Sequence, residues 1–179
     1  MCQPSPRAGW RRGQRALHWW TAGLVAAGFV IAWVMVGAPL SALLLKFLLY
    51  QLHKTIGLTV LALTTARLVL RAIHRRPAWA ERLPDWQRRA ASVVHAVLYG
   101  LLLVTPVLGY LTAATAPALF LLVLSVPHVV GPDPTWFAVL RPVHRGCAVA
   151  LVGLALGHAM AAVHHHMHGR SVLVGMWRG

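Results

Sequence analysis

Four long apolar stretches set the pattern of hydrophobic and polar positions along the chain. They cover residues 16–36, 50–70, 92–111 and 143–163. Each has about the twenty residues that an α-helix needs to cross a hydrocarbon core, and the connections between them are too short or too broken for a further domain. The pattern predicts an all-α, integral membrane four-helix bundle that forms a single domain over residues 1–179.

A fifth apolar run lies between the third and fourth stretches. It covers residues 116–126 and is bracketed by Pro117 and Pro127. Because this run is too short to span a bilayer, we expect a short interfacial segment that lies along the membrane surface or covers the mouth of the bundle. The first long stretch could instead be a cleaved signal peptide behind Arg11 and Arg12, but its length and the lack of an evident cleavage sequence favour a span.

Positive charge is concentrated on one side of the predicted bundle. The chain has 17 Lys and Arg against 3 Asp and Glu, a net charge of +14, and 58% of its residues are hydrophobic. This composition excludes a soluble single-domain protein. Most of the cations precede the first stretch, surround the connection between the second and third stretches, or follow the fourth stretch, and all three places lie on the same side of the bundle. Four cations lie on the other side: Lys46, Lys54, Arg141 and Arg145. By the positive-inside rule both termini are cytoplasmic, and the excess charge indicates contact with anionic lipid rather than with nucleic acid.

The histidines inside the apolar stretches fall at two depths. His144 and His158 are fourteen residues apart, which places them about 21 Å apart along a helix but only about 40° apart around it. With the predicted orientation, His18 matches His158 near the cytoplasmic edge, and His53 matches His144 near the outer edge. Ionisable side chains at such depths are costly and indicate a functional site. Two imidazoles from different helices at each depth suit six-coordinate haem iron, so the pattern indicates two stacked metal centres.

Two further residues share a helix face with His53. Gly57 could leave room for a flat macrocycle, and it could equally serve only the close packing of helices. Arg67 could neutralise a propionate of the inner haem, or it could be an arginine that extends to the membrane surface and fixes the topology. Both alternatives stay open at both positions.

Cysteine content constrains how a haem is held. The only cysteines are Cys2 and Cys147, and no C-x-x-C-H attachment motif occurs, so any haem is expected to be non-covalent and b-type.

A histidine tract follows the fourth stretch and comprises His164, His165, His166 and His168. The tract could bind a metal ion, or it could complement the dipole at a helix end. Both interpretations stay open.

Several short motifs occur in a fixed order along the chain. They are Leu17-His18-Trp19-Trp20, His53-x-x-x-Gly57, Arg67-Leu68-x-Leu70-Arg71, His95-x-x-x-Tyr99, Thr105-Pro106-Val107-x-Gly109, His144 and Gly157-His158. Together they resemble the bacterial cytochrome b561 family, over nearly the whole chain. The resemblance implies a di-haem cytochrome b domain in which His18 and His158 bind one b haem and His53 and His144 bind the other.

The resemblance also suggests electron donors and acceptors. Members of the family include a superoxide oxidase, which takes electrons from superoxide outside and passes them to ubiquinone. His95 matches a family histidine at the expected start of the third helix, so it could line a quinone pocket and protonate the reduced ring, or it could hydrogen-bond a propionate or a headgroup. Lys54 and Arg145 each follow an outer histidine by one residue and could steer superoxide inward.

The predicted function is transmembrane electron transfer through two b haems in the bacterial inner membrane. The leading version is an oxidoreductase that oxidises superoxide at the outer face and reduces ubiquinone. The alternative is a relay or anchor subunit that passes electrons between a dehydrogenase or hydrogenase partner and the quinone pool. Membrane lipid is an expected partner in both versions.

Overall fold

The computed structural model describes residues 12–73, 84–116, 130–168 and 172–177, so all but the first residue of the interfacial segment predicted at 116–126 lie outside the described residues. The helices are α1 (Arg12–Gly37), the 3-10 helix η1 (Leu40–Ala42), α2 (Leu43–Ile73), α3 (Asp85–Ala114), α4 (Pro134–Met167) and α5 (Val172–Trp177). The described residues form no strand. Four of the helices in these ranges are long and apolar enough to cross a membrane, so the predicted all-α membrane four-helix bundle is confirmed.

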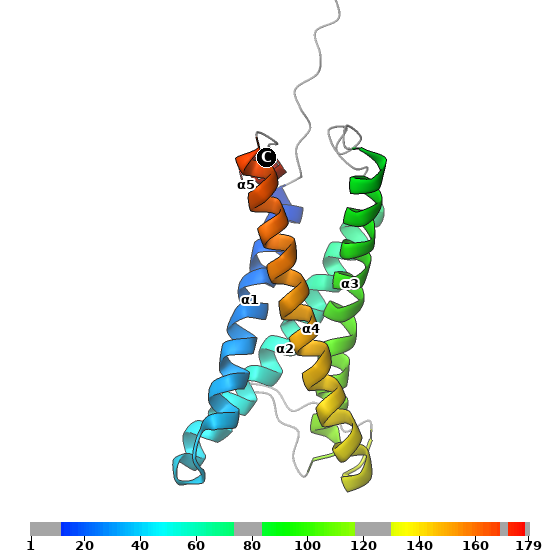
Figure 1. Cartoon of the computed structure of the whole chain (residues 1–179). Coiled ribbons are helices and arrows are strands. Elements are labelled where there is room, and N and C mark those ends of the chain that lie inside the picture. Colours follow the sequence, from blue (N-terminus) through cyan, green and yellow to red (C-terminus); the bar gives the residue numbers. More distant parts are fainter. Residues whose placement is uncertain (1–11, 74–83, 117–129, 169–171, 178–179) are drawn as a thin grey trace, which may run out of the picture.

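The four long helices lie side by side and alternate in direction (Figure 1). α1 packs on α2, α3 packs on α4, and α2 joins the two pairs through α3. The starts of α1 and α3, the ends of α2 and α4, and α5 lie at the top of Figure 1. We call this end of the bundle the terminal end and the opposite end the distal end. That the terminal end faces the cytoplasm stays a prediction.

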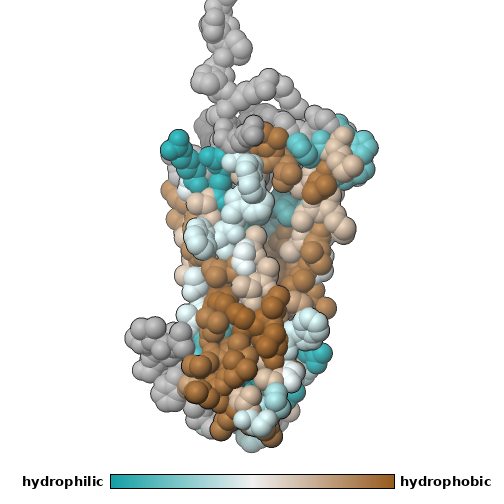
Figure 2. Space-filling view, turned by 90° about the vertical axis from the view of Figure 1, so that its left-hand side faces the viewer, coloured by the Kyte–Doolittle hydropathy of each residue, from teal (hydrophilic) through white to brown (hydrophobic). Residues whose placement is uncertain are grey.

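A seven-residue spacing marks the face that α1 turns toward the bundle. Its buried residues are Gln14, Thr21, Gly28 and Met35, and each follows the previous one by about two helical turns. All four long helices expose large apolar side chains on their other faces. Figure 2 shows hydrophobic residues over much of one side of the molecule, with hydrophilic residues gathered toward the ends. Such a surface suits contact with lipid tails, which are as apolar as leucine.

All four long helices begin before the apolar stretches that predict them. α1 begins at Arg12, α2 at Leu43, α3 at Asp85 and α4 at Pro134, which is four, seven, seven and nine residues before the predicted boundaries. The start of α4 has a local cause, because the Asp133 side chain accepts hydrogen bonds from two free N–H groups of its first turn at 2.8 and 3.1 Å. Hydropathy identifies the part of a helix that lies in hydrocarbon, whereas capping decides where the helix begins.

The earlier starts correct two expected positions. His53 lies ten residues after the first residue of α2, rather than one turn into it, and His95 lies ten residues after the first residue of α3, rather than at its start. Ten residues correspond to about 15 Å of helix. Both histidines therefore lie well inside the bundle.

The apolar core lies near the middle of the bundle. Its buried centre is Val60, Leu102 and Leu151. Five partly buried side chains pack around this centre: Leu24, Val25, Ile56, Leu98 and Leu101. Leu151 is seven residues, or about two turns, from both His144 and His158. The core therefore separates one layer of histidines from another.

Candidate functional site

His53 on α2 and His144 on α4 lie together on the distal side of the core. Their ring centroids are 6.2 Å apart and their ring planes meet at 79°. Both side chains are half-buried. We call these two residues the distal pair.

Each ring of the distal pair is held by a backbone carbonyl of another helix. His53 Nδ1 lies 3.0 Å from the carbonyl oxygen of Gly28 on α1, and His144 Nδ1 lies 3.0 Å from that of Thr105 on α3. Because a carbonyl oxygen only accepts, Nδ1–H is the donor in both bonds. The neutral ring then has an unprotonated Nε2 that can ligate a metal, and such a bond at the other nitrogen is what orients histidine ligands in metal sites.

Gly109 on α3 leaves room for the His144 ring. A Cβ at Gly109 would lie 2.9 Å from Cε1 of His144, a distance that would force one of the two groups to move. On the other side of the pair, a Cβ at Gly28 would lie 3.2 Å from Cγ2 of Ile56. α1 and α3 therefore each support the distal pair with one carbonyl and one closely packed glycine.

Three histidines gather on the terminal side of the core. The ring centroids of His18 on α1 and His158 on α4 are 6.5 Å apart with the planes at 86°, and those of His95 on α3 and His158 are 5.1 Å apart at 73°. We call these three residues the terminal cluster. His95 Nδ1 donates to the carbonyl of Ala91 at 2.6 Å, which leaves its Nε2 for another partner.

The ring spacings test whether these histidines fit a haem. A metal lies about 2 Å from an imidazole nitrogen, so two imidazoles on opposite sides of one iron have centroids about 6 Å apart. The spacings of 6.2 Å for His53 with His144 and 6.5 Å for His18 with His158 agree with this value. The 5.1 Å between the ring centroids of His95 and His158 is too short to place an iron between them, so these two rings contact each other directly. The structure thus brings together the residues that the sequence matches by depth, and their role as haem ligands stays a prediction.

Two arginines and a tyrosine lie beside the terminal cluster. The guanidinium carbons of Arg67 and Arg71 on α2 each lie 5.4 Å from the ring centroid of Tyr99 on α3, within the range of a cation–π contact. Arg67 also acts electrostatically on all three histidines of the cluster. The sequence singled out Arg67 but gave no role to Arg71 or Tyr99, although each follows Arg67 or His95 by four residues and so shares a helix face with it.

The two described acidic residues are engaged elsewhere. Asp85 pairs with Arg88 at 2.7 Å, and Asp133 caps α4. A half-buried cation is stabilised by a nearby anion, so Arg67 and Arg71 fit a site for a ligand carboxylate such as a haem propionate.

Gly57 borders open space on α2, one turn after His53. A Cβ at this position would meet no described atom within 4 Å, other than those of its own helix backbone and chain neighbours. Close helix packing therefore explains Gly28 and Gly109 but not Gly57. Other described glycines, such as Gly100 on α3, border open space as well, so a macrocycle beside Gly57 stays a prediction.

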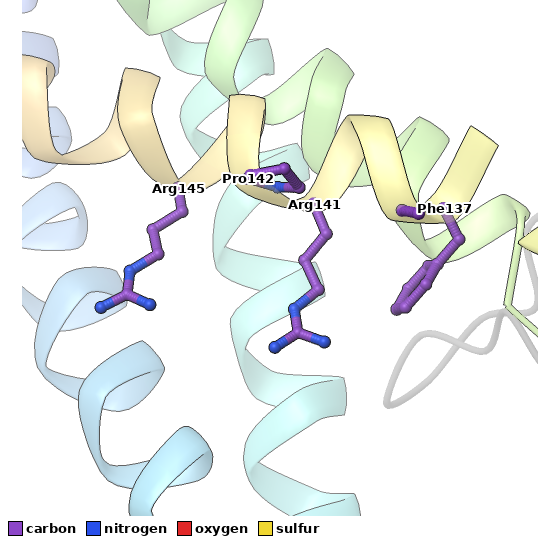
Figure 3. Close-up of a pocket in the computed structure, with 5 residues that line it drawn as sticks. Phe137, Arg141, Pro142 and Arg145 are labelled. Atoms are coloured by element: carbon purple, nitrogen blue, oxygen red, sulfur yellow. The ribbon is translucent and has the colours of Figure 1, made fainter. Parts of the chain in front are cut away.

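The two cations predicted to attract superoxide lie on different helices of the distal end. Lys54 is half-buried on α2, and Arg145 is exposed on α4. A pocket of about 350 Å³ near the start of α4 is lined by Phe137, Ala138, Arg141, Pro142 and Arg145. Figure 3 shows the Arg141 and Arg145 side chains extending from the same side of α4. Arg145 therefore shares a pocket with Arg141, and Lys54 is not among the residues that line it.

The histidine tract makes contacts within the last turns of α4. The ring centroids of His164 and His168 are 4.2 Å apart, and His168 Nδ1 donates to the carbonyl of His164 at 2.8 Å. Within the described ranges, no group of three or more His, Cys, Asp or Glu side chains is arranged to hold a metal ion. The helix-end interpretation accounts for the contacts that the tract makes.

Comparison with known proteins places the chain in a family. The family model described as prokaryotic cytochrome b561 matches residues 9–179. The chain is also 29% identical over 155 residues to a protein named cytochrome b561 homolog 1 from Escherichia coli (strain K12), covering 84% of this chain and 85% of that protein. The chain therefore belongs to the prokaryotic cytochrome b561 family, whose members bind b-type haem and transfer electrons across membranes.

Proposed function

We propose that the chain binds two b haems, one between His18 and His158 and the other between His53 and His144. The observation that carries this proposal is the spacing of the ring centroids, 6.5 Å in the first pair and 6.2 Å in the second. Both values suit two axial imidazoles on one iron. A single haem would leave one matched pair without a role.

Residues around each pair have separate tasks in this proposal. The Gly28 and Thr105 carbonyls keep the distal rings in one tautomer and one orientation. Arg67 and Arg71 would hold the propionates of a terminal haem, and Gly57 would leave room for a distal haem. Bound haem would supply one-electron oxidation and reduction at each layer. The apolar core between the layers excludes water from the path between them.

Electrons enter at the distal layer and leave at the terminal layer in this scheme. Two superoxide anions give up two electrons and become two molecules of O₂, and one ubiquinone takes up those two electrons with two protons to become ubiquinol. Lys54 and Arg145 attract the superoxide anion by their positive charge. The chain is then a superoxide:quinone oxidoreductase.

His95 is the proposed proton donor to the reduced quinone. Its Nδ1 is engaged by the Ala91 carbonyl, so Nε2 is the atom that takes up and releases the proton. Its ring contacts that of His158, with the centroids 5.1 Å apart, so a quinone that accepts electrons from the terminal haem would find a proton source nearby.

The proposed location is the bacterial inner membrane, with the terminal end in the cytoplasm. The support is the unequal distribution of Lys and Arg, of which four of the 17 belong to the distal end. Ubiquinone would reach the terminal cluster from the surrounding lipid.

The proposal is tested with the purified chain in lipid nanodiscs that contain ubiquinone. Haem absorbance is followed under a controlled superoxide flux, and the expected result is rapid haem reduction followed by reoxidation that depends on ubiquinone. If superoxide does not reduce the haem at any ionic strength, the oxidase function is wrong. A stable complex with a dehydrogenase or hydrogenase would then support the relay subunit.

A further inference from the structure

The pocket at the start of α4 is lined by both basic and apolar side chains. In Figure 3, Arg145, Arg141 and Phe137 extend in a row from one side of the helix, with Pro142 at its backbone. The row follows from their spacing of four residues, which places side chains one above another on a helix. Phe137 is half-buried, whereas both arginines are exposed.

Two guanidinium groups one turn apart repel each other unless an anion lies between them. Of the acidic residues that the structure describes, Asp133 uses its carboxylate to cap α4 and Asp85 pairs with Arg88. Neither described carboxylate therefore pairs with Arg141 or Arg145, and both exposed guanidinium groups are open to an added anion. Paired guanidinium forks match the oxygen atoms of a phosphate, to which they can donate several charge-assisted hydrogen bonds.

The position of the pocket along α4 favours a lipid as the source of that phosphate. The apolar stretch of this helix begins at residue 143, and Arg141 and Arg145 bracket this boundary. Arginines at such a boundary lie at the level of lipid headgroups. The Phe137 ring offers an apolar surface that a small inorganic anion does not need.

We propose that the Arg141–Arg145 pocket binds the phosphate of an anionic phospholipid, and that this lipid lowers the attraction of superoxide to the distal end. The second part rests on the proposed superoxide oxidase function, whereas the first does not. A bound phosphate neutralises Arg145, one of the two cations assigned to superoxide attraction, so the lipid regulates how fast electrons enter.

Lipid binding is measured first, on the full chain without superoxide or quinone. Native mass spectrometry follows binding of phosphatidylglycerol, phosphatidylcholine and inorganic phosphate, each added separately to detergent-purified protein. We expect one phosphatidylglycerol to bind, and the double variant Arg141→Gln/Arg145→Gln to bind it roughly thirtyfold more weakly. The control is Lys46→Gln, which removes another distal cation whose Nζ donates to the Ala38 carbonyl at 3.0 Å, outside the pocket.

Three results would overturn the lipid assignment. The first is equal affinity for phosphatidylglycerol in the wild type and in the double variant with its haem spectrum intact. The second is phosphatidylcholine binding as tightly as phosphatidylglycerol. The third is inorganic phosphate binding as tightly as phosphatidylglycerol, which would assign the pocket to free phosphate.

The regulatory part is measured in nanodiscs with and without phosphatidylglycerol. Anionic lipid should slow haem reduction by superoxide more in the wild type than in Arg141→Gln/Arg145→Gln. The negative charge of the membrane surface repels superoxide from both proteins, whereas lipid bound in the pocket neutralises Arg145 only in the wild type. An equal slowing of both proteins would overturn this part. If superoxide reduces neither protein in either nanodisc, the oxidase function and the regulatory part both fail, while the mass spectrometry still decides the lipid site.

Discussion

The distal pair and the terminal cluster hold their histidines by different means. Around the distal pair, backbone carbonyls of Gly28 and Thr105 bind the two Nδ1 atoms, and Gly109 packs against one ring. Around the terminal cluster, the Arg67 guanidinium acts electrostatically on the three imidazoles, and Arg67 and Arg71 both contact the Tyr99 ring. Carbonyls of neighbouring helices and close packing fix the distal site, whereas charge distinguishes the terminal site.

This difference gives the proposed electron path a direction. Positive charge stabilises the reduced form of a nearby haem, because reduction adds one electron. Arg67 and Arg71 lie beside the terminal cluster, where their positive charge would favour the reduced form of a bound haem. This charge would favour electron movement from the distal layer to the terminal layer.

The largest expected effect is the loss of one haem when a ligand is removed. His53→Ala and His144→Ala should each eliminate the same spectral component, and His18→Ala and His158→Ala should each eliminate the other. Redox titration followed by absorbance separates the two components. Different components missing from His53→Ala and His144→Ala would show that these residues do not share a haem.

The next effect is steric and should be confined to the distal site. Gly109→Ala would place a methyl group 2.9 Å from Cε1 of His144, so the ring must move and haem binding at the distal site should be weakened or lost. The expected loss of folding stability is about 1–3 kcal/mol. Gly100→Ala is the matched control on the same helix, since a Cβ there meets nothing within 4 Å. Thermal unfolding and haem content are the measurements. Equal behaviour of the two variants would remove Gly109 from the site.

A smaller effect is expected from charge at the terminal site. Arg67→Gln should lower the potential of the terminal haem by tens of millivolts, where about 59 mV corresponds to a tenfold change in a one-electron equilibrium. The distal haem should keep its potential, and Arg88→Gln, at an exposed residue paired with Asp85, should change neither. Potentiometric titration of both haems tests this. A similar shift of both haems in Arg67→Gln would contradict the comparison of the two sites.

The smallest effect concerns the attraction of superoxide. Lys54→Gln combined with Arg145→Gln should slow haem reduction by superoxide a few fold at low salt. The difference in rate between the wild type and this double variant should shrink with added salt, because salt screens charges beyond about 8 Å at 0.15 M. Reduction rates at several ionic strengths, with the haem spectrum checked first, are the measurement. A rate that neither the substitutions nor salt changes would rule out steering by these two residues.

The fold and the histidine pairs could be predicted because they follow from local periodicity. Four apolar stretches define four helices, and the fourteen-residue separation of His144 and His158 fixes two layers. The predicted position of His95 within its helix was wrong by seven residues, or about two turns, because hydropathy does not report the first turns of α3.

The supporting contacts could not be predicted, because they depend on how distant helices pack. The carbonyls of Gly28 and Thr105 belong to residues 25 and 39 positions away from the histidines they hold. A backbone carbonyl has no sequence signature, and the Thr105–Gly109 motif gave no indication that Gly109 would face His144. Arg71 and Tyr99 could have been found from their four-residue spacing to Arg67 and His95.

The central claim, one haem in each layer, is tested most directly by the haem content of the purified wild-type chain. The pyridine haemochrome assay together with protein quantification should give two b haems per chain, both extractable into acid acetone because no cysteine motif attaches them. Both should be low-spin when oxidised, as expected for two histidine ligands on each iron. A ratio of one haem per chain in intact protein would contradict the account, because one of the two histidine pairs would then have no iron to bind.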